Sequence, residues 1–548
     1  MPVSLLTWLD GVVAALLPPL AIFLILSGLD DLFLDLALLR LRRRLQLPYS
    51  GGEDPPEKRT AIFIPLWREH RVVEGMLAHN LAAIRYGSYD VFLGTYPNDE
   101  PTLEAARRAE QRYGNVHLAV CPHDGPTSKA DCLNWIYQHM LLFEEQQGVR
   151  FELVVTHDAE DIIHPDTLRW INRYSQAYDM VQIPVLPLPT PVHQLTHGVY
   201  CDEFAEYQTK DVPLRTVLGG FLPSNGVGTG YSRRALEALA ESGANRVFEP
   251  DCLTEDYENG YRLHKLGFRQ LFVAWHFSDG QPVATREYFP QRFRQAVRQR
   301  TRWILGIALQ SWQRHGWGGR FGERYWFWRD RKGLIGNPVS LLSNILFFYG
   351  AVTWCASYWS GRPWGLAEAA GSRFSLWLAV ALSLTAVRTA LRMRSVARFY
   401  GWAFALGTPV RTVWANWLNT VATFGALSRY AVARLRNRPL VWVKTEHSYP
   451  TREALVAMRL ITADELRQRV EHVEPERVRR EVARALPARV VRQWRVLPFK
   501  VENGALLVAT PEVPPPALRE GLRSFTRLEI RFHLVSAENY EELVRRLL

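Results

Sequence analysis

The chain has 548 residues and a formal net charge of +11, a length that exceeds a single core and predicts three or four domains. Only seven of its 66 basic residues are lysine, and the arginines cluster beside apolar runs. This pattern indicates a membrane surface and argues against a nucleic-acid polymer as a partner. The five cysteines have no Cys-x-x-Cys spacing, which argues against a cysteine metal cluster and a disulfide framework.

The first expected element is a membrane anchor within residues 1–45. Gly11 to Leu29 carries no charge and is long enough to cross a bilayer core of roughly 30 Å as a helix, which the Pro18-Pro19 pair would kink. No basic residue precedes this segment, and the cluster Arg40–Arg44 follows it. This asymmetry predicts that the N-terminus lies outside and that the chain enters the cytoplasm at the cluster.

An α/β domain is expected over residues 46–325, after a polar linker at Pro48–Arg59. Four apolar stretches have the composition of strands, with helical patterns between them: "AIFIPLW", "YDVFLGTY", "HLAVCP" and "FELVVTH". Alternating strands and helices predict a mostly parallel sheet flanked by helices, with ligands at the carboxyl ends of the strands.

Charged residues near this expected edge suggest a phosphate and metal site. Lys129 could contact a phosphate, with a surface lysine as an equal alternative. The fourth strand runs directly into Asp158, Glu160 and Asp161. A divalent ion that bridges a diphosphate needs one or two carboxylates on a rigid support, so Asp158 and Glu160 are candidate metal ligands. The alternative is an exposed acidic turn before Pro165.

A glycine-rich turn and an acidic helix start follow. Gly226, Gly228 and Gly230 would let backbone approach a ligand closely. Thr254 can cap a helix that begins at Glu255 and continues to about Lys265, before Gly267. Within that motif, Asp256 could act as a general base toward an attacking hydroxyl. The alternative is that these acids only complement the helix dipole.

A third candidate motif, Gln299 to Trp303, lies on an arginine-rich helical stretch. Arg302 could neutralise phosphate and Trp303 could stack on a sugar ring. The alternative is a basic amphipathic face against lipid headgroups. His157, His276 and Cys252 lie near the three motifs and are expected to be structural.

Residues 326–440 are expected to hold transmembrane and interfacial helices. Gly333–Gly361 and Phe374–Val387 are uncharged runs that predict two further crossings. Phe399–Ser428 has basic residues on both sides and Arg411 within it. It is therefore a hairpin, a re-entrant segment or an interfacial helix, with the last two favoured, and the C-terminus is cytoplasmic.

The tail, residues 441–548, predicts a small α+β module. Two helical patterns are expected first, with Thr462 as the cap of the second. A hairpin turns at Glu502-Asn503-Gly504, and a helix starts near Ala517. The strand "LEIRFHLV" and a helix at Tyr540–Leu548 complete the module.

The order of these motifs, from Thr60 to Gly318, resembles the membrane-bound family 2 glycosyltransferases, which include cellulose and hyaluronan synthases. The resemblance implies a GT-A fold in which Asp158 and Glu160 coordinate Mg²⁺ or Mn²⁺ on a UDP-sugar. It makes Asp256 the base of an inverting displacement, within a motif shared with Thr254 and Glu255. The family more often has Asp at the position of Glu160, and the longer side chain could change metal preference.

The same resemblance assigns further binding residues. Gln299, Arg302 and Trp303 would hold the diphosphate and the acceptor. The stretch "IFIPLWREH", which contains Glu69, looks like the opening strand of the fold and its nucleotide-binding loop. Asp99 stands where the first nucleotide-binding aspartate of the family usually lies. Together with Lys129 and Gly228, these residues form the predicted nucleotide and substrate site.

The whole chain is most similar to one subgroup, the bacteriophage adsorption protein B family. The phrases "ATREYFPQRFRQAVRQRTRWILGIALQSW" and "RVLPFKVENGALLVATPEVPPPALREGL" carry this resemblance. It implies a C-terminal module like the N-terminal domain of type II secretion ATPases (MshEN), which in relatives can bind cyclic di-GMP. Here the Arg-Leu-Gly start of that motif reads Pro450-Thr451-Arg452, so cyclic di-GMP binding stays open.

These expectations combine into an enzyme of the bacterial inner membrane, with cytoplasmic catalytic and C-terminal domains and a periplasmic N-terminus. It would build or extend an exported polysaccharide from a UDP-sugar. Three crossings are too few to enclose a polymer channel, so export would need a homo-oligomer or an envelope partner. Two alternatives stay open: transfer of a single sugar to a lipid carrier, and an inactive assembly protein that recruits an outer-membrane partner.

Overall fold

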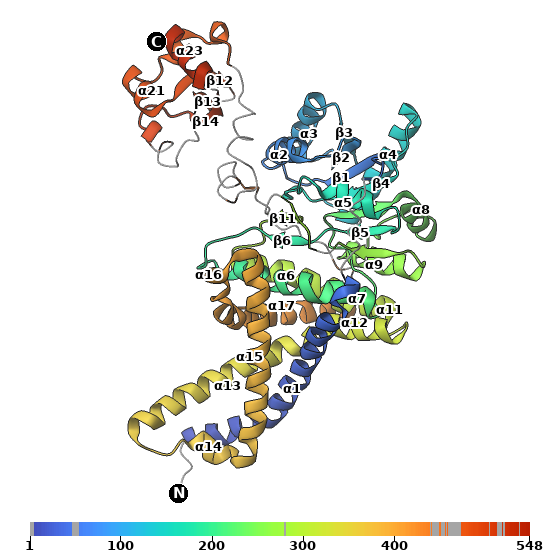
Figure 1. The fold of residues 1–548 in the computed structure, drawn as a ribbon, viewed down its shortest axis with the longest axis vertical. Coiled ribbons are helices and arrows are strands. Elements are labelled where there is room, and N and C mark those ends of the chain that lie inside the picture. The colour runs from blue at the N-terminus through green and yellow to red at the C-terminus, as the bar shows by residue number, and fades with distance from the viewer. Residues whose placement is uncertain are drawn as a thin grey trace. The chain divides into compact units, whose positions relative to one another are not determined.

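The computed structural model describes residues 5–45, 54–273, 275–278, 281–438, 440, 449–450, 455, 458, 473–502, 505–511, 518, 521–535 and 537–548. The chain divides into two compact units, residues 1–449 and 450–548. The first unit contains an α/β domain, a layer of short helices and a group of long apolar helices (Figure 1). The predictions for the first part of the linker (residues 48–53), for Thr451, Arg452 and Thr462, for the turn at Asn503-Gly504 and for Ala517 lie outside the described residues.

A seven-stranded sheet forms the centre of the α/β domain. In spatial order its strands are β3 (Val116–Val120), β2 (Tyr89–Thr95), β1 (Thr60–Pro65), β4 (Leu153–Thr156), β7 (Thr229–Ser232), β5 (Met180–Gln182) and β8 (Gln270–Phe272). All neighbouring strands are parallel except the two pairs that involve β7. The four predicted strands and the mostly parallel sheet are therefore confirmed.

Helices cover both faces of this sheet, and the side-chain alternation of β1 shows why. Phe63 packs with the helices of one face and Ile62 and Ile64 with those of the other. The first face carries α4 (Lys129–Gln147), α8 (Arg233–Ser242) and α9 (Glu255–Lys265); the second carries α2 (Val73–Ala83), α3 (Glu100–Arg112) and α5 (Thr167–Tyr174). A strand buried on both faces is apolar throughout, as the run "AIFI" is.

A layer of short helices and strands and one longer helix lies between this domain and the long apolar helices (Figure 1). It consists of β6 (Val185–Pro187), α6 (Leu195–Glu206), the π-helical η1 (Tyr207–Asp211), α7 (Val212–Val217), β9 (Phe277–Ser278), β10 (Gln281–Pro282), β11 (Thr285–Glu287), α10 (Phe293–Trp303), the π-helical η2 (Ile304–Gln310), α11 (Ser311–His315), α12 (Phe321–Arg331), α16 (Trp402–Ala405) and α17 (Thr408–Leu435). β6 pairs with β11 in parallel, and β9 pairs with β10 in antiparallel orientation.

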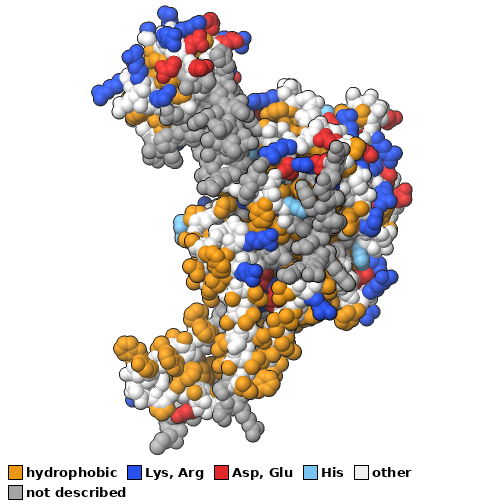
Figure 2. All heavy atoms as spheres, viewed as in Figure 1, with side chains coloured by type: hydrophobic (Ala, Val, Ile, Leu, Met, Phe, Trp, Pro, Cys, Tyr) orange, Lys and Arg blue, Asp and Glu red, His pale blue; other side chains and the backbone are white. Residues whose placement is uncertain are grey.

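The predicted apolar segments fold as long helices: α1 (Leu5–Leu45), α13 (Gly333–Ser360) and α15 (Ser372–Tyr400), with the short α14 (Gly365–Ala370) before α15. In the described part of the chain, three helices are long and apolar enough to cross a membrane, over Leu5–Leu41, Gly333–Ser360 and Leu376–Tyr400. Hydrophobic side chains cover the exposed surface of this helical group (Figure 2). Both Pro18 and Pro19 lie inside α1.

The fourth apolar run is not a hairpin. It forms α16 and then the single helix α17, which packs against α6, α10 and α13. One face of α17 is buried through Leu418 and Ala422, and the opposite face exposes Val410 and Trp417. This amphipathic pattern is typical of an interfacial helix, and it agrees with the absence of α17 from the three candidate spans among the described residues.

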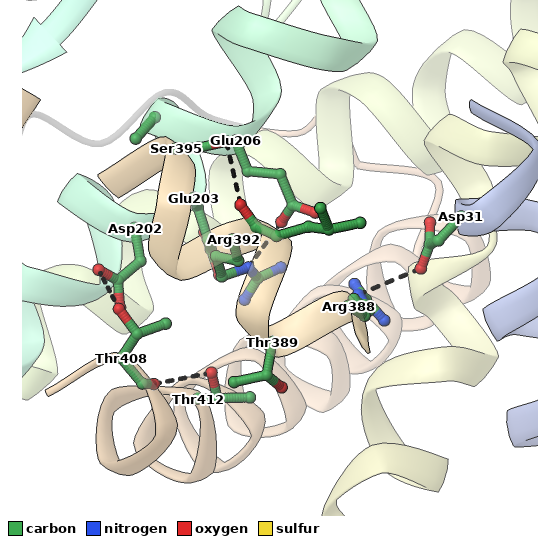
Figure 3. A network of polar contacts seen from close by, with 12 residues as sticks. Asp31, Asp202, Glu203, Glu206, Arg388, Thr389, Arg392, Ser395, Thr408 and Thr412 are labelled. Carbon is green, nitrogen blue, oxygen red and sulfur yellow. Dashed lines mark hydrogen bonds and ion pairs between the residues drawn. The ribbon is translucent and has the colours of Figure 1, made fainter. Parts of the chain in front are cut away.

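Ion pairs link the long helices to one another and to the intermediate layer, and link helices within that layer (Figure 3). Asp31 of α1 pairs with Arg388 of α15 at 3.1 Å, and Glu206 of α6 pairs with Arg392 of α15 at 2.6 Å. Arg411 of α17 is 1% exposed and donates two hydrogen bonds of 2.8 Å to Asp202 of α6. Arg411, the charged residue within the fourth apolar run, is therefore the buried ion-pair partner of Asp202 in α6.

The second unit is a small α+β module with its own core. Its elements are η3 (Pro475–Arg477), α20 (Arg480–Ala483), α21 (Ala488–Trp494), β12 (Leu497–Glu502), β13 (Ala505–Thr510), β14 (Glu529–Leu534) and α23 (Ala537–Leu547). β12 and β13 are antiparallel, as the hairpin prediction requires, and β14 joins β13 in parallel. Apolar side chains of the sheet pack against α23 through Leu543.

Candidate active site

The acidic loop after β4 divides into two supporting side chains and two that face a cavity. His157 and Asp161 are fully buried, with His157 Nδ1 2.8 Å from Asp161 Oδ2. Asp161 Oδ2 also accepts the backbone N–H of Asp158 at 3.0 Å. Burial, reinforced by the charges of Asp158 and Glu160, raises the pKa of Asp161, and burial lowers the pKa of His157 to about 3. Asp161 therefore fixes the loop, whereas Asp158 and Glu160 line the cavity.

This cavity lies at the carboxyl ends of β1, β2 and β4, with an empty volume of about 1050 Å³ that includes the solvent at its mouth. Ten of the twelve residues predicted for the site line it: Glu69, Lys129, Asp158, Glu160, Thr254, Glu255, Asp256, Gln299, Arg302 and Trp303. Motifs separated by more than 200 residues in the chain therefore share one pocket.

Lys129 is the first residue of α4, whose N-cap Ser128 accepts the backbone N–H of Asp131. Its ammonium lies 2.5 Å from Asp158 Oδ1. Burial disfavours this charge, but the attraction of Asp158 and of the carboxylates of α9 outweighs the effect and raises the pKa of Lys129. Lys129 is thus a cation inside the cavity and not a surface lysine.

The first turn of α9 brings the second acidic motif to the same cavity. Asp256 Oδ1 accepts the backbone N–H of Tyr257 at 2.8 Å. Burial raises the pKa of Asp256, and Lys129 opposes the shift. Burial and the adjacent Asp256 raise the pKa of Glu255 to about 7. The expected side-chain cap is wrong: Thr254 occupies the N-cap position but makes no capping hydrogen bond.

A glycine allows the close approach between these motifs. Gly226 has φ +77°, and a Cβ there would lie 2.8 Å from Asp256 Oδ2 and 3.4 Å from Lys129 Nζ. Any other residue would be strained and would crowd the carboxylate. Gly226, which the sequence offered among three glycines, is therefore the one that permits the contact with α9.

α10, which packs against α17, contributes the third motif. Gln299, Arg302 and Trp303 face the cavity. Among the described residues, Gln299 Oε1 and Arg302 Nε are buried without a hydrogen-bond partner, an arrangement that a polar ligand would relieve. Arg300 of the same helix points away and hydrogen-bonds Glu203 and Asn419 at 2.7 Å each.

Two predicted site residues do not line the cavity. Asp99 Oδ2 accepts the backbone N–H of Arg68 at 2.5 Å and so holds the loop that carries Glu69. Gly228 also has a positive φ, but a Cβ there would meet Thr285 Oγ1 at 2.5 Å, away from the cavity. Gly228 is therefore not among the residues that line this cavity; its backbone N–H donates to the carbonyl oxygen of Thr156 at 2.9 Å.

Several residues that line the cavity were not predicted from the sequence. Trp67 lies two residues after the end of β1 and Tyr96 directly after β2. Their ring centroids are 5.4 Å apart, and both residues line the cavity. Their position just past the ends of parallel strands was the available signal. Asn225, Glu287 and Phe289 also line it, and no spacing in the sequence marks them.

The side chains present fit a divalent cation held mainly by its substrate. Among the described residues, no group of three or more His, Cys, Asp or Glu side chains could hold a metal ion. Mg²⁺ and similar hard cations commonly use one or two carboxylates, with phosphate and water oxygens filling the other positions. Asp158 and Glu160 supply two such carboxylates in one cavity.

Comparison with known proteins gives matches over nearly the whole chain. Residues 55–306 match the family model described as glycosyltransferase like family 2, and residues 464–548 match the MshEN domain. Bacteriophage adsorption protein B of Escherichia coli K12 is 32% identical over an alignment 605 positions long, which covers 96% of this chain and 81% of that protein. Bacteriophage N4 adsorption protein B of E. coli O157:H7 matches with the same identity and coverage.

Solved structures also align with the chain. A mannosyltransferase from Pyrobaculum calidifontis in complex with GDP-Man and Mn²⁺ has a TM-score of 0.43 and 19% identity, covering 73% of this chain and 99% of that one. TarS of S. aureus, residues 1–349 in complex with UDP-GlcNAc, has a TM-score of 0.28 and 12% identity, covering 56% of this chain and 92% of that one.

Proposed function

Since this chain belongs to the bacteriophage adsorption protein B family and is a family 2 glycosyltransferase, we propose that it transfers a sugar from a UDP-sugar to an acceptor at a membrane, with inversion at the anomeric carbon. Asp256 is the general base, with Glu255 and Thr254 completing its motif. Lys129, Arg302, Gln299 and Glu69 bind the donor, and Asp158 and Glu160 hold Mg²⁺ or Mn²⁺.

The observation that carries this proposal is the convergence of all three motifs on one cavity. Lys129 and Arg302 bring positive charge to a site that also contains Asp158 and Asp256. Cations on the wall favour a diphosphate, and the carboxylate at the start of α9 is placed to accept a proton. A purely structural acidic turn would not need partly buried cations and unsatisfied polar atoms around it.

The proposed step balances as a single displacement. The acceptor hydroxyl oxygen attacks the anomeric carbon of the donor while its proton passes to an Asp256 carboxylate oxygen. The bond from the anomeric carbon to the diphosphate oxygen breaks on the opposite side, and UDP leaves with that electron pair. A divalent cation at Asp158 and Glu160 would supply charge neutralisation for the leaving diphosphate. Trp303 would support the acceptor by stacking.

The proposed setting is the bacterial inner membrane. The three candidate spans and the amphipathic α17 support membrane attachment, and the basic flanks support a cytoplasmic catalytic domain and C-terminal module with a periplasmic N-terminus. The proposed acceptor is a growing exported polysaccharide, which would need an oligomer or an envelope partner for export. Transfer of one sugar to a lipid-linked acceptor is the competing enzyme activity, and sizing the product by gel separates the two.

Regulation by cyclic di-GMP is a further open part of this proposal. The MshEN match at residues 464–548 supports a regulatory module. The stretch Pro450–Arg452, which stands before that match at the expected start of the nucleotide motif, departs from the family pattern, and Thr451 and Arg452 lie outside the described residues. The alternatives are an effector site for cyclic di-GMP and a module without one.

The test is sugar transfer by purified protein against a panel of UDP-sugars with Mn²⁺ or Mg²⁺, with and without cyclic di-GMP. We expect Asp256→Asn to lower the transfer rate by about 10²- to 10⁴-fold, because the acceptor proton then has no base. Asp251→Asn is the matched control, since Asp251 is exposed five residues earlier. Equal transfer by wild type and Asp256→Asn would refute the assignment.

A further inference from the structure

The back of the α9 first turn carries a buried hydrogen bond that the catalytic proposal does not use. Tyr257 is 4% exposed and its hydroxyl donates to Asp330 Oδ2 at 2.7 Å. Its ring packs edge-to-face on Phe221 with centroids 5.2 Å apart. The backbone N–H of the same residue donates to Asp256 Oδ1. Tyr257 therefore touches the proposed base on one side and Asp330 on the other.

Asp330 is itself rigidly held. Arg215 of α7 donates to both of its carboxylate oxygens at 2.8 Å each. Arg215 is 1% exposed, and its guanidinium carbon lies 4.9 Å from the ring centroids of Phe221 and Trp326. A bidentate pair enclosed by aromatic rings has little freedom to move. Asp330 is thus a fixed acceptor for the tyrosine hydroxyl.

The helix that carries Asp330 also binds the N-terminal anchor. The preceding residue, Arg329, pairs with Asp30 and lies 3.3 Å from Asp31 Oδ1, both in α1. Tyr325, one turn earlier in α12, donates its hydroxyl to Asp30 at 2.7 Å. α12 is therefore held to α1 on one side and to the start of α9 on the other.

We propose that Tyr257, Asp330 and Arg215 are positioning residues that set the orientation of the Asp256 carboxylate. The inference rests on Asp256 as the proposed base. Helix α9 begins with Glu255 and its N-cap threonine makes no side-chain cap, so the first turn lacks the usual local restraint. The Tyr257–Asp330 bond supplies that restraint from outside the cavity, and small displacements of a catalytic group are costly.

The test compares two tyrosines of the same helix. Tyr257→Phe keeps the ring and removes only the hydroxyl. Tyr261→Phe is the matched control, because its ring packs on the same Phe221 at 5.1 Å and its hydroxyl makes no hydrogen bond within the described part of the chain. We expect Tyr257→Phe to lower kcat about tenfold, with the KM for the UDP-sugar and the Kd for UDP changed by no more than about twofold. Tyr261→Phe should match wild type.

A double variant separates positioning from general damage. If Tyr257 acts through Asp256, Tyr257→Phe causes no further loss of kcat in an Asp256→Asn background. If its effect is a general structural one, the two losses of kcat multiply in the double variant. Asp330→Asn should reproduce the kcat loss of Tyr257→Phe without loss of UDP binding. The inference is overturned if Tyr257→Phe equals Tyr261→Phe, or if its loss persists in the double variant. Wild-type transfer by Asp256→Asn alone would instead refute the base assignment.

Discussion

Within the cavity, the direction of a carboxylate separates residues that can bind a ligand from those that support the site. Asp158 and Glu160 line the cavity, whereas Asp161 turns inward to His157 and to the backbone of Asp158. All three follow the same strand, and their residue types alone do not distinguish them. Asp161 Oδ2 has two hydrogen-bond partners in the loop, His157 Nδ1 and the backbone N–H of Asp158, which offset part of the cost of burying it, whereas Asp161 Oδ1 has none among the described residues.

Glu255 provides a prediction about pH. Burial and the adjacent Asp256 raise its pKa to about 7 in the folded protein. In the unfolded chain, the pKa of a glutamate stays near its ordinary value. Between these two pKa values, Glu255 binds its proton more tightly in the folded state than in the unfolded state. The contribution of protonated Glu255 to the free energy of unfolding is therefore lost as the pH rises through about 7. We expect Glu255→Gln to be more stable than wild type at pH 8, by up to about 3 kcal/mol, and to show less change between pH 5 and pH 8.

Thermal melting of detergent-solubilised protein, without divalent cation or nucleotide, measures this effect. Asp251→Asn again serves as control and should keep the wild-type pH dependence, because that side chain is exposed. The prediction fails if Glu255→Gln melts no higher than wild type at pH 8.

At the scale of elements, α17 shows how a charged residue can lie within an apolar run. Arg411 is enclosed by Asp202 and by two glycines whose added Cβ atoms would each lie 2.5 Å from its side chain, Gly198 and Gly407. The guanidinium also donates to the carbonyl oxygen of Phe404 at 2.8 Å. α6, α16 and α17 are therefore joined by one buried side chain.

Breaking this pair should destabilise the protein. Arg411→Met leaves Asp202 charged and buried, which costs about 3–5 kcal/mol. Replacing both partners, as Arg411→Met with Asp202→Leu, should recover most of that loss, since no charge is then left unpaired. Denaturation of the solubilised protein measures both, with Arg429→Met on the exposed side of the same helix as control. A single variant as stable as this control would contradict the role assigned to the pair.

At the scale of the whole molecule, the two units have separate cores, and the residues that line the cavity all lie between positions 65 and 303. Tyr449 marks the end of the first unit. It packs with the apolar core beside α2, its ring centroid 6.4 Å from that of His79. The first unit thus uses a residue well beyond its last helix to complete its core.

Two truncations test this division. A chain that ends at Tyr449 should keep basal sugar transfer and the melting temperature of the first unit, because it retains the whole cavity and the Tyr449 contact. A chain that ends at Arg438 loses that aromatic contact and should be less stable by about 1–3 kcal/mol. Transfer assays and melting curves measure both. Loss of sugar transfer by the chain that ends at Tyr449 would contradict the conclusion that the first unit alone contains the active site.

The sequence by itself determined the local elements and the identity of the motifs. Short apolar runs marked β1 to β4, uncharged segments marked α1, α13 and α15, and the Glu255–Lys265 helix ended as its glycine predicted. These features depend on neighbours along the chain, so residue order is enough to find them.

Only the tertiary structure decided which side chains meet. It placed Asp99 and Gly228 outside the cavity, brought Trp67 and Tyr96 into it, and paired Tyr257 with Asp330. Such contacts join residues far apart in sequence, and each depends on the direction of a side chain at the end of a packed element. That direction follows from the packing of the whole unit, which no local pattern contains.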